Sequence, residues 1–165
     1  MGEMHSAALA LKHQIEEAFS SIQYPGDDNI VEKDFPEYID VAKRFGGKDW
    51  RIWKDNPGEL LMDTVGDISF FSPQAFCYYL PLYMLNELFI PSDYPFYGEV
   101  IGSLAPSSVS EVDNVVNRRL ACMNRAQLRA VLEFLAFMKN KIHNPTAYPL
   151  ADAIANVSSA LTKQQ

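Results

Sequence analysis

Residues 72–88 read SPQAFCYYLPLYMLNEL, and all but the last two of them lie in a run from Ile68 to Asn86 that carries no charged side chain. Ser72 is suited to cap a helix, and Pro73 to its first position, where the missing N–H costs nothing. A helix without a polar face must be covered on all sides, by lipid or by other helices. Two prolines and several hydroxyl and amide groups disfavour lipid, so the stretch predicts a buried central helix.

The segments outside this stretch show the spacing of amphipathic helices. Residues 34–45 predict a helix capped by Asp34, with Glu37 completing a capping box and Phe35 and Ile39 in its apolar stripe. Asn124 is a good cap for the clearest amphipathic segment, which continues to residue 142. Further helices are predicted over residues 6–22, 97–104 and 148–161.

For two segments the sequence is compatible with more than one kind of secondary structure. Residues 48–67 suit either a short helix or an irregular layer, and residues 109–120 suit a helix or a strand. Residues 105–110 predict a loop. Together the segments predict an all-α or mainly α bundle of five to seven helices, forming one domain over 1–165 with flexible ends near 1–5 and 162–165.

Length and composition exclude several classes of protein. The 165 residues suit one domain, and 48% hydrophobic with 21% charged residues is ordinary for a globular protein. This excludes a disordered chain and a disulfide-dense scaffold. Cys77 and Cys122 form no CxxC pair, and we expect both to be small buried hydrophobes in a reducing cytosol. The N-terminus lacks the pattern of a secretory signal, so we expect a cytoplasmic protein.

The charges are unevenly distributed along the chain. The net charge of -7 disfavours nucleic acid and anionic membranes as partners. Residues 55–117 hold nine acidic and no basic residues, whereas residues 118–165 hold seven basic and two acidic ones. The basic C-terminal third could pack beside the acidic middle third. Alternatively, the acidic middle could form a face that receives a basic partner.

No motif in the sequence assigns a reaction. There is no HExxH, phosphate loop or GxSxG, so we assign no catalytic residue and no cofactor. Asp27, Asp28 and Asn29 follow a turn and carry oxygen atoms that could bind a divalent cation, although their spacing does not match an EF-hand. The simpler interpretation is that they close the turn through Asx hydrogen bonds. The aromatic residues of 72–88 suit core packing, or else a ligand pocket or partner surface.

Three segments of the chain together carry a resemblance to a known family. They are YPGDDNIV at residues 24–31, FSPQAFCYYLPLYM at residues 71–84 and RAQLRAVLEFL at residues 125–135. In this order they resemble a bacterial family of small cytosolic proteins of unknown function, over about residues 11–138. The resemblance implies a bacterial protein and brings no activity, cofactor or site residue with it.

The leading hypothesis is a non-enzymatic protein-binding module, such as a bacterial immunity or antitoxin-like protein that occludes a basic partner. The alternative is a metal- or small-molecule-dependent enzyme or sensor, built on the Asp27-Asp28-Asn29 loop and the aromatic helix 72–88. A third hypothesis is a homodimer that buries this helix between subunits, so both a monomer and a homodimer stay open. The expected partner contacts are Asp27, Asp28, Trp50, Glu87, Asp93 and Tyr94.

Overall fold

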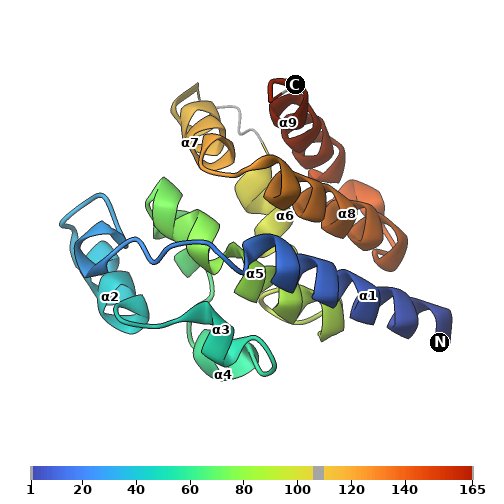
Figure 1. Ribbon diagram of the computed structural model, residues 1–165, viewed down its shortest axis with the longest axis horizontal. Helices are drawn as coiled ribbons and strands as arrows, with labels where there is room; N and C mark the ends of the chain where they lie inside the picture. The colour runs from blue at the N-terminus through green and yellow to red at the C-terminus, as the bar shows by residue number, and fades with distance from the viewer. Residues whose placement is uncertain (1, 106–109, 165) are drawn as a thin grey trace.

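The protein is mainly α-helical (Figure 1). The structure, a computed structural model, describes residues 2–105 and 110–164. These residues form nine α-helices and no strand beyond one isolated bridge between Val31 and Phe71. Six helices have ten residues or more, which confirms the predicted mainly α bundle. The elements are α1 (Gly2–Phe19), η1 (Asp27–Asn29), α2 (Pro36–Phe45), α3 (Trp50–Trp53), α4 (Gly58–Leu61), η2 (Asp67–Phe70), α5 (Pro73–Phe89), α6 (Glu99–Leu104), α7 (Ser110–Ala121), α8 (Arg125–Lys141), η3 (Pro145–Ala147) and α9 (Leu150–Thr162), where η marks a 3₁₀ turn.

Helix α5 is the centre of the fold. Every residue from Ala75 to Leu88 is buried, and helices α1, α3, α6 and α7 pack around it. The Ser72 hydroxyl accepts a hydrogen bond from the Ala75 N–H at 3.1 Å, and Pro73 is the first helical residue, as predicted. A helix covered by protein on all sides has no need of a polar face. Because its own chain already covers α5, no second subunit is needed to bury it, and the choice between monomer and homodimer stays a prediction. No helix in the described residues has the length and hydropathy needed to span a membrane.

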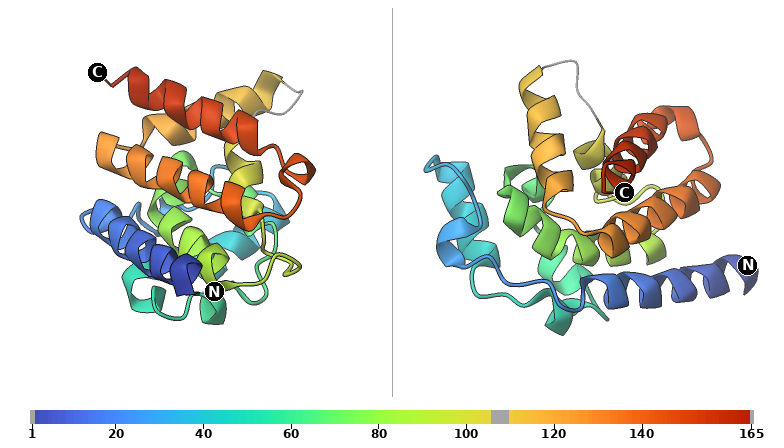
Figure 2. Two further views of the ribbon diagram at one scale, coloured as in Figure 1. Left: turned by 90° about the vertical axis from the view of Figure 1, so that its right-hand side faces the viewer. Right: turned by 45° about the horizontal axis from the view of Figure 1, so that its top comes forward.

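Helices α1, α8 and α9 lie side by side with α8 in the middle, and α1 also packs against α5 (Figure 2). Helix α8 begins after the predicted cap Asn124, which forms a capping box with Gln127. The Gln127 N–H donates to Asn124 Oδ1 at 2.9 Å, and the Asn124 N–H donates to Gln127 Oε1 at 3.0 Å. Phe134 and Leu135 of α8 and Ile15 of α1 are fully buried in the core. The layer is therefore stabilised mainly by apolar burial.

Helix α2 lies at the opposite edge of the molecule, near the N-terminal end of α5 (Figure 1). The predicted capping box of Asp34 and Glu37 is wrong. The cap position is Phe35, which makes no side-chain capping bond, and the helix begins at Pro36. Pro36 needs no N–H partner in the first turn, so this helix end has one fewer donor for a cap to satisfy.

The structure decides between the alternatives for the two segments that the sequence left undecided. Residues 48–67 form α3 and α4 joined by turns, and residues 110–120 form most of α7. Helix α1 begins at Gly2 and ends at Phe19, earlier at both ends than the predicted 6–22. The loop predicted over 105–110 falls largely on residues 106–109, which lie outside the described residues, as do residues 1 and 165 of the predicted flexible ends.

Candidate functional site

The loop over residues 24–31 is fixed to the N-terminal end of α5. The Ser72 hydroxyl donates to the Asn29 carbonyl at 2.6 Å, and the Ser72 N–H donates to the Ile30 carbonyl at 2.9 Å. The aromatic rings of Tyr24 and Tyr78 meet edge to face, with centroids 5.3 Å apart. The loop and the aromatic helix, which are separate motifs in the sequence, are therefore one structural unit.

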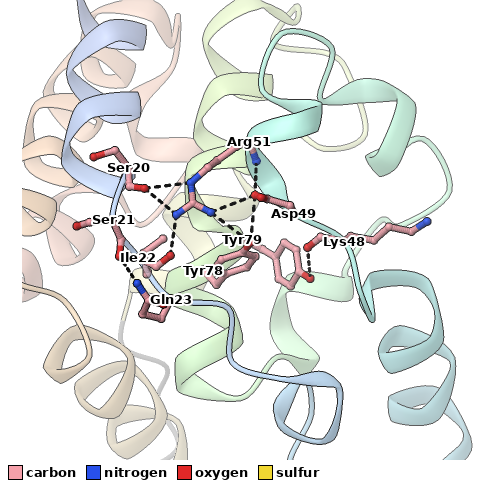
Figure 3. A network of polar contacts seen from close by, with 9 residues as sticks. All are labelled: Ser20, Ser21, Ile22, Gln23, Lys48, Asp49, Arg51, Tyr78 and Tyr79. Atoms are coloured by element: carbon pink, nitrogen blue, oxygen red, sulfur yellow. Dashed lines mark hydrogen bonds and ion pairs between the residues drawn. The ribbon is translucent and has the colours of Figure 1, made fainter.

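Arg51 ties this unit together through its guanidinium group (Figure 3). Its Nη2 donates to the carbonyls of Ser20 and Ile22, each at 2.7 Å, and its Nε donates to Ser20 at 3.0 Å. Its Nη1 donates to Asp49 Oδ1 at 3.1 Å, and this oxygen also accepts from the Tyr78 hydroxyl at 3.1 Å. One planar cation thus satisfies carbonyls after the end of α1 and links them to α3 and α5.

The ionisable groups of this network are held in fixed protonation states. Burial raises the pKa of Tyr78 to about 12, and the nearby Asp49 carboxylate adds to the effect. Burial also raises the pKa of Asp49, but hydrogen bonds from Arg51 and Tyr78 outweigh it and leave the pKa below its usual value. Asp49 is therefore ionised and Tyr78 neutral at neutral pH, which suits a structural network better than proton transfer.

Asp27 and Asn29 close the turn. The Tyr24 hydroxyl donates to the Asp27 carboxylate, and the Gly47 N–H donates to the Tyr24 oxygen at 2.6 Å and to Asp27 Oδ1 at 2.9 Å. The Asn29 side chain donates to the Pro25 carbonyl at 2.8 Å. Across the described part of the chain, no three His, Cys, Asp or Glu side chains come together to hold a metal ion. The enzyme or sensor hypothesis for this loop gains no support from these contacts.

An open groove of about 460 Å³ lies between the 27–34 segment and α2. We call it the 27–46 groove; its lining residues are Asp27, Asp28, Val31, Lys33, Asp34, Ile39, Ala42, Lys43 and Gly46. Two of the charged residues in this part of the chain are neutralised by ion pairs, Glu32 by Arg118 and Arg44 by Asp67.

The remaining charges around the groove are mainly acidic. Glu37 and Asp40 are exposed on α2, and with the three lining aspartates they make five carboxylates against two lysines. None of these seven side chains has an ion-pair partner within the described residues. The groove therefore offers a net negative surface that is not neutralised internally.

Two large apolar side chains are exposed beside these carboxylates. Phe35 is 60% exposed and Ile39 is 41% exposed, although both were predicted to lie in the apolar stripe of α2. The buried residues of this helix are Val41 and Phe45, and Tyr38 and Ala42 are half-buried. Exposed apolar groups ringed by charge are typical of a surface that contacts another protein.

Two of the predicted partner contacts are wrong because the side chains are buried. Trp50 is 1% exposed, with the Arg51 guanidinium 5.5 Å from its ring centroid. Glu87 is also 1% exposed, and its Oε1 accepts the Val100 N–H at 3.0 Å at the start of α6. Neither side chain can reach a partner in this structure.

The other predicted contacts lie at two ends of the molecule. Asp27 and Asp28 are exposed near the first residue of α5, whereas Asp93 and Tyr94 follow its last residue. A helix of 17 residues is about 25 Å long, so these pairs do not form one compact surface. Asp93 is exposed and Tyr94 is half-buried, with its hydroxyl 3.7 Å from the sulfur of Met62.

The acidic middle third is partly internal. Asp67 and Glu87 are buried and Glu99 is half-buried, so these three do not belong to the acidic face that was one of the two alternatives for residues 55–117. Burial raises the pKa of Glu87 to about 8 and that of Glu99 to about 7. These carboxyl groups therefore contribute less negative charge at neutral pH than the sequence implies.

The expectation that both cysteines are buried is wrong for one of them. Cys77 is buried in α5, but Cys122 is exposed just after α7. An apolar neighbourhood in the sequence did not reveal this, because Cys122 lies in the turn between α7 and α8.

These observations define a mainly α-helical protein with a buried aromatic helix and an exposed, negatively charged groove. The chain belongs to DUF6714, a family of unknown function, whose model matches residues 8–156. The match extends beyond the resemblance found over residues 11–138 and includes the first half of α9. No curated protein and no solved structure matches the chain.

Proposed function

We propose that this chain is a bacterial, cytoplasmic protein-binding module of the immunity or antitoxin type, which occludes a basic partner protein at the 27–46 groove. The observation that carries the proposal is the exposure of Phe35 and Ile39 among carboxylates that have no internal ion pair. Apolar contacts of this kind stabilise a complex once formed, and the surrounding charge speeds the encounter.

The arrangement of the groove supports a protein partner rather than a small ligand. The groove is open, and the carboxylates in and around it are spread over the 27–34 segment and α2. A small ligand is usually enclosed on most sides, whereas a protein partner needs a wide surface. Lys33 and Lys43 also line the groove, so the partner is expected to carry a few acidic groups among its basic ones.

The loop behind the groove is well suited to hold such a surface. Arg51 and Ser72 fix residues 20–30 to the rest of the fold through backbone carbonyls. Surfaces that are rigid before binding lose less conformational entropy in the complex. We expect the groove to change little when the partner binds.

The proposal is tested by affinity capture from the native host with a double variant, Asp28→Asn with Asp34→Asn. The tagged wild-type chain is expected to retain one basic protein, and the variant to retain at least about tenfold less of it, because two groove charges are lost. Retention is measured by quantitative mass spectrometry, and moderate salt is expected to lower it for the wild type.

The matched control is Glu133→Gln with Asp152→Asn, which removes two exposed charges from α8 and α9. It should retain the partner like the wild type. Equal losses in both variants would mean that net charge alone matters, and the groove would not be the binding site. A wild-type chain that retains no basic protein would contradict the proposed function itself.

A further inference from the structure

The two cysteines meet at one backbone carbonyl between α5 and α7. The Cys77 thiol donates to the Arg119 carbonyl at 3.2 Å, and the Cys122 N–H donates to the same oxygen at 3.2 Å. The shared acceptor brings the two residues close together, although they are 45 positions apart in the chain. A buried thiol therefore lies beside an exposed one.

We propose that Cys77 and Cys122 are a redox pair that forms a reversible disulfide when a peroxide oxidises Cys122. The exposed sulfur is the one an oxidant can reach, and the buried sulfur resolves the oxidised product. An accessible thiol with a second cysteine in contact is the arrangement that redox-sensing proteins use.

The chemistry balances with one peroxide molecule. The Cys122 thiolate attacks a peroxide oxygen, so an S–O bond forms as the O–O bond breaks, and the released hydroxide takes a proton to become water. The Cys77 sulfur then gives up its proton and attacks the sulfenic sulfur of Cys122. The S–S bond forms as the S–O bond breaks, and a second water leaves. Each sulfur supplies one of the two electrons that reduce the peroxide.

The surroundings favour this order of events. The neighbouring Cys77 thiol lowers the pKa of Cys122 to about 7, and the positive charge of Arg118 contributes in the same direction. The interaction with Cys122 raises the pKa of Cys77, and burial raises it further. Cys122 is therefore the thiolate that reacts first, and Cys77 keeps its proton until a sulfenic acid forms beside it.

The test treats the native, reduced chain with hydrogen peroxide, and then alkylates it with iodoacetamide after denaturation. The wild-type chain is expected to lose both alkylatable thiols and the mass of two hydrogen atoms, and dithiothreitol should restore both. A peptide map should join the peptides of Cys77 and Cys122. Sulfinic acid on Cys122 beside a free Cys77, crosslinks between chains, or two unmodified thiols would each overturn the proposal.

A Cys77→Ala variant separates the two roles. In this variant Cys122 should stop at the sulfenic acid, which dimedone traps, whereas the wild type should trap little. The native alkylation rate of Cys122 at pH 7 should fall by about tenfold, because the neighbouring thiol that lowers its pKa is gone. An unchanged rate together with unchanged dimedone trapping would show that the two thiols act independently.

Discussion

Replacing Glu87 by Gln is expected to stabilise the protein above pH 8 and to change its stability little at pH 5. Glu87 is 1% exposed, and its Oε2 has no hydrogen-bond partner within the described residues. Burial raises its pKa to about 8, while the nearby charge of Lys141 offsets only part of this effect. Gln has the shape of the protonated acid and keeps an oxygen for the Val100 N–H.

The direction of the pH dependence follows from the two pKa values. The unfolded carboxyl has a pKa near 4.5 and the folded one about 8, so the folded chain holds an extra proton between these values. The free energy of unfolding therefore falls as the pH rises from about 4.5 to about 8. Above pH 8 the stabilisation that the protonated Glu87 carboxyl gave to the folded chain is lost. The Gln variant lacks this slope, and its advantage well above pH 8 is on the order of 5 kcal/mol.

Chemical denaturation from pH 5 to pH 9 measures this difference. Glu99, with a pKa raised to about 7, leaves a smaller slope at lower pH in the Glu87→Gln variant. The exposed Glu133 provides the control, since Glu133→Gln should run parallel to the wild type. A Glu87→Gln curve parallel to the wild type would show that Glu87 is ionised in the folded chain.

Replacing Arg51 by Ala is expected to lower the free energy of unfolding by about 3 kcal/mol, because two backbone carbonyls and Asp49 lose a charged donor. The side chain is one-third exposed, which keeps the loss below that of a fully buried group. Arg51→Lys should recover little, since an ammonium group cannot bridge the same carbonyls in a planar fork. Urea denaturation measures both changes.

Arg129→Ala is the matched control for Arg51, because it removes an exposed guanidinium from α8. It should change the free energy of unfolding by less than about 0.5 kcal/mol. If Arg51→Lys were as stable as the wild type, the forked contacts would not be what holds residues 20–22 to α3 and α5.

The helices were predictable because their signals are local. Ser72 with Pro73, and Asn124, mark helix starts through contacts within one turn, and both starts appear in the structure. The uncharged run over residues 68–86 predicted burial, because a helix without a charged face has no side that could face water. Helix starts without a side-chain cap, such as Phe35 before α2, leave no such signal.

The candidate surface was harder to predict because it depends on tertiary contacts. The sequence singled out Asp27 and Asp28, and both line the groove. It placed Phe35 and Ile39 in the core, since an apolar residue at helical spacing does not reveal which side of the helix is covered. The stripe at Val41 and Phe45 occupies the covered side.

The distribution of charge along the sequence also did not predict which charged side chains lie on the surface. Nine carboxyl groups over residues 55–117 suggested an acidic face, but Glu87 is buried against the start of α6. Glu99 accepts a hydrogen bond from the Gly66 N–H. Both contacts join segments distant in sequence, so no local pattern could have revealed them.

The most direct test of the proposed function compares the affinities of two single variants for the basic protein that the wild type retains. Phe35→Ser removes the exposed ring beside the 27–46 groove, and Ile52→Ser removes a side chain on α3 that is 76% exposed. Titration calorimetry should show a loss of at least about tenfold for Phe35→Ser and no change for Ile52→Ser. Equal affinities of Phe35→Ser and the wild type would contradict the assignment of the groove as the binding surface.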